Sequence, residues 1–228
     1  MEKLVTNYHT HTKRCGHAYG EDEDFVLSAI KYGIKELGFS DHISFKNISA
    51  PYMRQDRSML SDYISSISHL KEKYKNQIKI HLGFEAEYIE EFVEDYKDLL
   101  ENHSIEYMIC GQHCFIKDNK QVFYNSFPHD EKMIEKYGKD VVKAIQSGLF
   151  KYIAHPDLFM NAYRVWDDKA KEVSRKIIEE ALKYNVPLEI NCNGIRYHYE
   201  KHKVSASGRV LENYYPCVES VSYTHLTL

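Results

Sequence analysis

Two histidines separated by one residue, His9 and His11, stand near the start of the chain, and His17 follows them. Residues 4–9 alternate between apolar and polar side chains, which predicts the end of a short β-strand. Side chains at positions i and i+2 of a strand project from one face, so both imidazoles should point at the same place. Imidazole is a frequent protein ligand for zinc and also suits iron. The pair therefore predicts half of a metal site, provided that the rest of the chain supplies partners.

Ligand-type residues recur where further strands are expected to end. The expected strands cover residues 4–9, 36–41, 78–85, 107–113, 152–155 and 187–191. Their ends carry His9 and His11, Asp41 and His42, Glu85, His113, His155 and Asp157, and Glu189 and Asn191. In parallel α/β proteins, the active site lies at the carboxyl ends of the strands. We therefore expect these residues to lie together, although any one of them could simply bond to nearby backbone.

Amphipathic helical patterns separate these strands. They cover residues 24–32, 56–74, 89–102, 130–146 and 167–184, with Asp56 and Asp130 as expected N-caps and Gly38 and Gly148 as expected helix ends. Strands that alternate with helices predict a parallel sheet with helices outside it. The spacing fits a (β/α) barrel at least as well as an open sheet, and no linker interrupts it. We predict an α/β fold in one domain.

The composition is that of an ordinary globular chain, with 228 residues, 43% hydrophobic and 28% charged. The net charge of -4 lacks the basic excess that would favour nucleic acid or an anionic membrane as a partner. No apolar run approaches the ~20 residues of a membrane span, and no signal-peptide pattern is present. The five cysteines lack CxxC spacing, which favours reduced thiols. We expect a cytoplasmic protein, and nothing in the sequence indicates an obligate protein partner.

The set of histidines and acids exceeds the roughly four ligands of one tetrahedral zinc. It suits a cluster of divalent ions bridged by a carboxylate, which generates a nucleophile at neutral pH and clamps phosphoryl oxygens. Hydrolysis of a small-molecule phosphate ester is the chemistry that this predicts. Of the 13 histidines, His69, His81, His103 and His129 are expected mostly to face solvent. Glu87 would share the strand face of Glu85 and is a second, lower-ranked ligand candidate.

Taken in order, these residues resemble the motifs of the polymerase-and-histidinol-phosphatase (PHP) superfamily. The matching motifs are His9-Thr10-His11, His17, Asp41-His42, Gly83-Phe84-Glu85-Ala86, His113 and Ala154-His155-Pro156-Asp157. Residues 12–18 and 189–196 look like its histidinol-phosphatase branch, and the resemblance extends from residue 4 to about residue 219. It implies a distorted (β/α)7 barrel that holds two or three divalent ions (zinc, iron or manganese). It also implies hydrolysis of L-histidinol phosphate to L-histidinol and phosphate, in histidine biosynthesis.

The resemblance further implies a role for each candidate residue. His9 and His11 would bind one metal, Glu85 would bridge to a second metal bound by His113 and His155, and His17 and His42 would hold a third. Glu85, His42 and Asp41 form the expected catalytic group, with Asp41 either orienting a ligand histidine or capping a helix. Arg196 is the first candidate for a phosphate contact, because a guanidinium matches phosphate oxygens bidentately. Arg14, Arg164 and His198 are further candidates for substrate contact.

The chain departs from the family pattern after Pro216. The pattern has one more strand carrying Asp-x-His, whereas this chain ends Ser-Val-Ser-Tyr-Thr-His-Leu-Thr-Leu over residues 220–228. We interpret residues 1–219 as a PHP domain that is incomplete at its C-terminus and residues 220–228 as a non-native tail, so that His225 is not a ligand. From this we expect a barrel without its last strand and helix, weak metal binding and little activity.

Other functions stay open at this point. The chain could be another PHP phosphoesterase that acts on a nucleotide or a phosphotyrosine, or a metal-binding fragment without catalysis. A TIM-barrel amidohydrolase also has an HxH pair on its first strand. That class would want a lysine or a further histidine at the ends of the middle strands, and none stands there.

Overall fold

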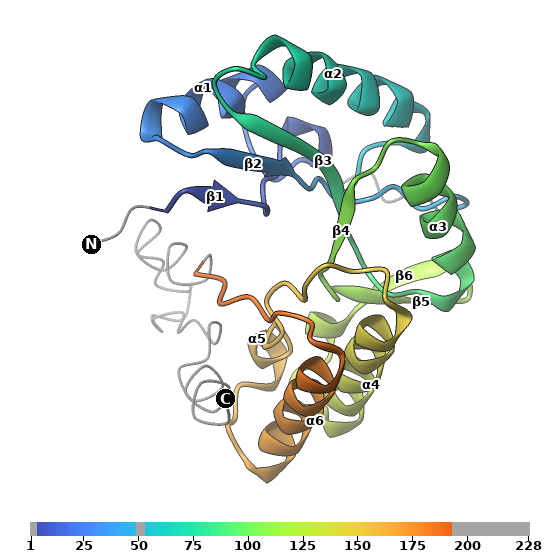
Figure 1. Cartoon of the computed structure of the whole chain (residues 1–228). Helices are drawn as coiled ribbons and strands as arrows, with labels where there is room; N and C mark the ends of the chain where they lie inside the picture. Colours follow the sequence, from blue (N-terminus) through green and yellow to red (C-terminus); the bar gives the residue numbers. More distant parts are fainter. Residues whose placement is uncertain (1–3, 49–52, 193–228) are drawn as a thin grey trace, which may run out of the picture. The chain divides into compact units, whose positions relative to one another are not determined.

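The computed structural model describes residues 4–48 and 53–192 (Figure 1). The chain separates into two compact units, Met1–Ile109 and Cys110–Leu228. None of the described helices is long and apolar enough to cross a membrane. The expected domain end at residue 219, the tail and the missing last strand and helix all fall outside the described residues.

The first unit is built on a parallel sheet with the strand order β1-β2-β3-β4. The strands are β1 (Thr6–Asn7), β2 (Glu36–Phe39), β3 (Lys79–Ala86) and β4 (Tyr107–Cys110). Asn7 lies opposite Leu37, and Leu37 lies opposite Ile80. All four expected strands are present here. The fourth was expected to reach residue 113, but the chain turns after Cys110, where the His113 amide donates to the Gly111 carbonyl.

The described part of the first unit contains the α-helices α1 (Asp22–Tyr32), α2 (Leu60–Lys73) and α3 (Val93–Asn102). Figure 1 shows α1 and α2 beside one face of β1–β3. The buried residues of α2 are Tyr63, Ile67 and Leu70, the spacing of one helical face. Asp56 is confirmed as a cap, since its carboxylate accepts from the Ser58 amide at the 3₁₀ turn before α2. Gly38 as a helix end is wrong, because α1 already ends at Gly33 and Gly38 lies within β2.

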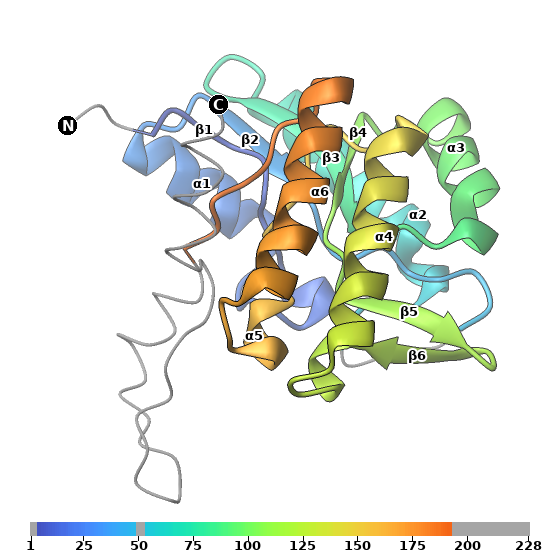
Figure 2. The same ribbon diagram turned by 90° about the horizontal axis from the view of Figure 1, so that it is seen from below.

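The second unit contains α4 (Glu131–Ser147), the short α5 (Met160–Tyr163) and α6 (Asp168–Tyr184). The long helices α4 and α6 pack side by side (Figure 2). Asp130 is confirmed as the N-cap of α4, and Gly148 ends that helix with a φ of 69°. Glycine is favoured there because other residues adopt this left-handed conformation only at a cost.

The expected strands at residues 152–155 and 187–191 are reduced to single parallel bridges in the second unit. Ile153 bridges Cys110 on one side and Leu188 on the other. Its amide donates to the Pro187 carbonyl at 3.0 Å, and its carbonyl accepts from the Glu189 amide at 2.9 Å. An antiparallel hairpin of β5 (Cys114–Lys117) and β6 (Lys120–Phe123) was not expected. Its two turn residues, Asp118 and Asn119, both have positive φ, as a tight hairpin turn requires.

Candidate metal centre

The segment that carries His9 and His11 leaves β1 but stays extended. The Thr10 amide donates to Ser40 Oγ at 3.0 Å, and the Ser40 amide donates to the Thr10 carbonyl at 2.9 Å. Because residues on either side of Thr10 project to one face, both imidazoles converge. The Nε2 atoms of His9 and His11 lie 3.1 Å apart.

Glu85 lies at the centre of these histidines. Its Oε2 is 3.3 Å from His9 Nε2, 3.0 Å from His11 Nε2 and 3.4 Å from His42 Nδ1. A parallel bridge between Glu85 and His42 holds the two backbones together. The Glu85 side chain is only 1% exposed and that of His42 only 4%. The first unit therefore brings one buried carboxylate and three imidazoles to a single point.

His17 joins the same group from the far side of a turn. Gly16, with a φ of 77°, ends the 3₁₀ turn Lys13–Cys15 and brings the chain back. The His17 ring lies 4.7 Å from the His42 ring and 5.6 Å from the His11 ring, measured between centroids. The ligand atoms of His11, Cys15 and His17 lie within 4.8 Å of one another, as do those of His11, His42 and Glu85. Cys15 in this position was not expected from the sequence.

Asp41 is fully buried and holds the turn between the histidines. Its Oδ1 accepts from the Thr12 amide at 2.6 Å and from Cys15 Sγ at 3.0 Å, and its Oδ2 accepts from Thr12 Oγ1 at 2.7 Å. Burial and the nearby Asp41 carboxylate raise the pKa of the Cys15 thiol well above its usual value. Asp41 caps no helix of its own; it anchors Thr12, which is the N-cap of the 3₁₀ turn.

In the second unit, the rings of His113 and His155 meet edge to face, with centroids 4.8 Å apart. His155 has a φ of 32°, which a residue other than glycine adopts only when its surroundings hold it. Two contacts do so. The His155 amide donates to Glu189 Oε2 at 3.0 Å, and the Tyr137 hydroxyl donates to the His155 carbonyl at 3.3 Å. The structure thus pairs the two candidate ligands of this unit.

The donor set fits divalent ions. Imidazole nitrogen and carboxylate oxygen suit zinc, iron and manganese alike, so the set does not select among them. A buried carboxylate surrounded by ring nitrogens at 3.0–3.4 Å also needs positive charge between its neighbours, from protons or from a cation.

The other predicted residues lie elsewhere or fall outside the described residues. Glu87, the lower-ranked ligand candidate, is paired with Arg54, with Nη2 to Oε1 at 2.5 Å and both side chains buried.

The Arg14 guanidinium donates to Asp22 and Asp62, and these bonds raise its pKa although burial opposes the shift. Arg164 is exposed and donates to the Asn161 carbonyl at 3.1 Å. Arg196 and His198 lie outside the described residues. Of the four histidines expected mostly to face solvent, His69, His103 and His129 are exposed, whereas His81 is partly buried and contacts Glu36 and Glu106.

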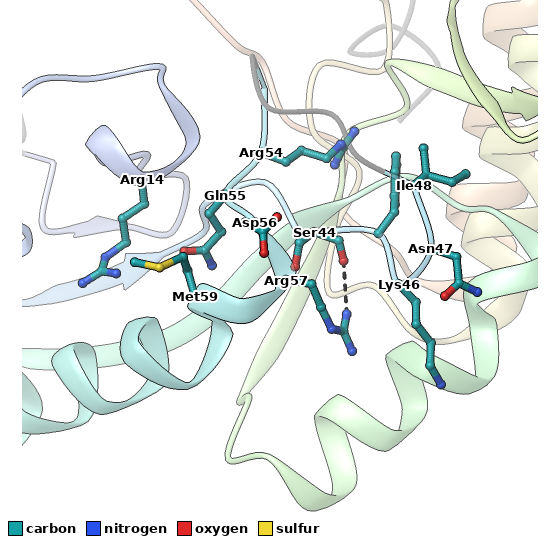
Figure 3. A pocket seen from close by; sticks show the side chains of 11 residues that line it. Arg14, Ser44, Lys46, Asn47, Ile48, Arg54, Gln55, Asp56, Arg57 and Met59 are labelled. Carbon is teal, nitrogen blue, oxygen red and sulfur yellow. Dashed lines mark hydrogen bonds between the residues drawn. The ribbon is translucent and has the colours of Figure 1, made fainter.

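A pocket of about 600 Å³ adjoins the segment that follows His42, and the sequence did not predict it. Figure 3 shows Arg14 and Met59 at one end and Lys46 and Asn47 at the other. Four cationic residues line it (Arg14, Lys46, Arg54 and Arg57), against one acidic residue, Asp56. Arg57 is bound to Asp95 through two nitrogens at 2.9 and 2.7 Å. The only sequence signal was the run Arg-Gln-Asp-Arg at residues 54–57.

Comparison with known families identifies the chain. The model of the PHP domain family matches residues 7–193. The chain belongs to the PHP domain family. The matched region contains the His9-to-His17 segment, Glu85 and the His113–His155 pair, so every described candidate ligand lies in the PHP domain.

A related protein from Deinococcus radiodurans, named "Probable histidinol-phosphatase", is 30% identical over 158 residues. The match covers 66% of this PHP chain and 59% of that relative, so the chain spans about three fifths of the relative's length.

Two solved structures have the same fold. A Listeria monocytogenes protein assigned as a histidinol phosphatase aligns over 97% of this chain and 90% of its own, with a TM-score of 0.73 and 19% identity. The histidinol phosphate phosphatase of Lactococcus lactis, solved with zinc, L-histidinol and phosphate, aligns over 83% of this chain and 74% of its own, with a TM-score of 0.66 and 18% identity. These matches confirm the expected α/β class of the PHP type.

Proposed function

We propose that this PHP domain is a metal-dependent phosphomonoesterase that hydrolyses L-histidinol phosphate to L-histidinol and phosphate. The observation that carries the proposal is the convergence of His9, His11 and His42 on the buried Glu85 carboxylate. A related chain of the same family is named for this activity. A structural relative holds zinc, L-histidinol and phosphate together.

The proposed ligands are the seven residues expected from the sequence, His9, His11, His17, His42, Glu85, His113 and His155, and they would hold two or three divalent ions. Divalent ions in such sites supply a nucleophile at neutral pH and positive charge for the transferring phosphoryl group. Backbone hydrogen bonds hold Glu85, the central carboxylate of the proposed site, in place. The Glu85 amide donates to the Asp41 carbonyl at 3.1 Å, and the Glu85 carbonyl accepts from the Ile43 amide at 2.9 Å.

The roles of the remaining residues follow from their contacts. Asp41 contributes by holding the turn from Thr12 to Cys15, which carries His11 and His17 at its two ends. Arg14 is committed to Asp22 and Asp62, so Arg196 stays the first candidate for a phosphate contact. The cytoplasmic location expected from the sequence stays a prediction.

The test is an assay of the purified chain after loading with zinc, manganese or iron. Phosphate release from L-histidinol phosphate is compared with release from a nucleoside monophosphate and from phosphotyrosine. We expect preference for histidinol phosphate, and Glu85→Gln should lower turnover by about 100-fold or more, because the central carboxylate is lost. Glu172→Gln is the control, since Glu172 lies in α6 and pairs with Lys169 and Lys176.

Two results would contradict the proposal. Preferred hydrolysis of a nucleotide or of phosphotyrosine would indicate another PHP phosphoesterase. Stoichiometric metal binding without release from any ester would indicate a metal-binding domain without catalysis. Metal content measured on the same sample separates the second result from a failure to bind metal.

A further inference from the structure

The thiol of Cys15 lies between a carboxylate and a candidate metal ligand. Its Sγ is 3.0 Å from Asp41 Oδ1, 3.6 Å from the Thr12 carbonyl and 3.4 Å from His11 Nδ1. Cys15 is 1% exposed and Asp41 is fully buried, so the contact between these two is shielded from solvent. Asp41, Cys15 and His11 form a continuous hydrogen-bond network that runs from the end of β2 to the His9–His11 segment.

The direction of the hydrogen bonds in this network follows from which groups can donate and which can accept. Asp41 as a carboxylate and the Thr12 carbonyl can only accept, and a thiol proton directed at His11 would leave the sulfur facing both of them without a proton. The single thiol proton therefore goes to one of these two acceptors. The sulfur is then left as an acceptor toward His11, and Nδ1 of His11 must carry the proton. A neutral imidazole with its proton on Nδ1 has its free lone pair on Nε2. That Nε2 faces Glu85 Oε2 at 3.0 Å and His9 Nε2 at 3.1 Å.

We propose that Cys15 is a positioning residue that links Asp41 to His11 and holds His11 in the tautomer whose Nε2 can bind a divalent ion. The proposal rests on the metal site of the proposed function, but it concerns how that site is prepared rather than which ester is cleaved. The unprotonated Nε2 toward the Glu85 carboxylate is unfavourable by itself, because two lone pairs face each other. Positive charge between the two atoms, which a divalent cation supplies, makes the same arrangement favourable, so the contact with Cys15 leaves Nε2 as the atom that faces the metal.

Cys15 has one alternative role, because its Sγ also lies within 4.8 Å of the ligand atoms of His11 and His17. As a thiolate it could itself bind metal. The contact with Asp41 argues against this role, since a thiolate 3.0 Å from a buried carboxylate would place two negative charges side by side. The protonated thiol, in contrast, satisfies both neighbours.

The test measures binding of Zn²⁺ and Co²⁺ to the full chain and to single variants. Cys15→Ala removes the link, and Cys15→Ser keeps a group that can donate to Asp41 and accept from His11. Groups that orient a ligand histidine typically affect metal affinity by about 10- to 100-fold when removed. We therefore expect that loss in Cys15→Ala and a loss of less than about threefold in Cys15→Ser. Cys110→Ala is the matched control, because Cys110 is also fully buried but its Sγ lies 3.7 Å from Gln112 Oε1.

Two spectra test the tautomer of His11 and the role of the Cys15 thiol directly. In the ¹⁵N spectrum of histidine-labelled, zinc-bound protein, the His11 signals should show a protonated Nδ1, and Cys15→Ala should broaden or shift them. The Co²⁺-loaded chain should lack a thiolate-to-cobalt charge-transfer band. If Cys15→Ala does not fold, Cys15→Val fills the volume without the hydrogen bonds and is compared with Cys15→Ser in its place.

Several results would overturn the proposal. The first is that Cys15→Ala or Cys15→Val binds zinc as tightly as the unaltered chain. Cys15→Ala and Cys110→Ala could weaken binding equally, which would reduce the effect to packing. A charge-transfer band that disappears in Cys15→Ser would make Cys15 a metal ligand. A failure of phosphatase activity alone, with the affinity pattern intact, would leave this proposal standing and contradict only the proposed function.

Discussion

The ring of Tyr107 lies directly against Gly83, so closely that a Cβ on Gly83 would sit 2.4 Å from Tyr107 Cε1. A Cβ on Gly38 would sit 2.3 Å from the Tyr107 hydroxyl oxygen. That hydroxyl donates to the carbonyls of Tyr8 and Phe39, at 3.0 and 2.9 Å. One side chain from β4 therefore packs across three neighbouring segments of the sheet. Both glycines are required by this close approach rather than by a turn.

Gly83→Ala should destabilise the chain by about 1–3 kcal/mol or more, because the methyl group cannot fit beside the ring. Gly38→Ala should have a similar effect, and urea unfolding measures both. Tyr107→Phe separates the two sites, since it removes the oxygen nearest to Gly38 but leaves the ring carbons nearest to Gly83. The double variant with Gly38→Ala should show a favourable coupling energy, whereas that with Gly83→Ala should show almost none. Equal coupling at both glycines would contradict the packing described here.

Arg54→Ala should cost about 3–5 kcal/mol, because it leaves the Glu87 carboxylate buried without its countercharge. Arg54 also donates to the Ile43 carbonyl at 2.9 Å, so that acceptor loses a partner too. Arg57→Ala is the comparison, since the Arg57 side chain is 27% exposed in its pair with Asp95 and should cost less. Adding Glu87→Gln to Arg54→Ala should recover part of the loss. If the two arginine variants unfolded at the same urea concentration, this would argue against a large cost of breaking the buried Arg54–Glu87 pair.

Alkaline pH should destabilise the second unit through Tyr163. Burial and a hydrogen bond to Asp167 raise the pKa of Tyr163 to about 12, whereas an unfolded tyrosine titrates near about 10. A raised folded pKa means that the stabilisation is complete below about pH 10 and is lost as the pH rises from about 10 to about 12. The free energy of unfolding, measured with urea across this pH range, should therefore fall more steeply for the unaltered chain than for Tyr163→Phe. Parallel curves would show that Tyr163 carries no such linkage, and the exposed Tyr32→Phe is the control.

Tyr137→Phe should destabilise the turn that carries His155. The Tyr137 hydroxyl donates to the carbonyls of His155 and Pro156, at 3.3 and 3.1 Å, and its ring is fully buried. Loss of the donor should cost about 1–3 kcal/mol and should speed hydrogen exchange of the amides after His155, such as that of Leu158. Tyr184→Phe, at an exposed tyrosine in the last turn of α6, should change neither. Unchanged exchange in Tyr137→Phe would mean that other contacts hold this turn.

Much of the fold could be predicted because its signals are local. Asp56, Asp130 and Gly148 act as expected, since a cap bonds to amides two or three residues away. The hairpin β5–β6 was missed although Asp118-Asn119 carries a turn signal, because residues 114–129 were assigned to no element between the strand expected to end at residue 113 and the helix expected from residue 130. Gly38 was misassigned because the side chain that requires a glycine there, Tyr107, lies 69 positions further along the chain.

The sequence by itself determined which donor groups the chain owns and in what order the strands present them, because strand periodicity sets the direction of His9 and His11. Only the tertiary structure decided which atoms meet. It placed Glu85 between three imidazoles, committed Glu87 to Arg54 and set Cys15 between Asp41 and His11. These outcomes depend on hydrogen bonds between residues distant in sequence, whose distances and directions no local pattern contains. A residue type thus predicts which chemistry is available, and packing selects the partner.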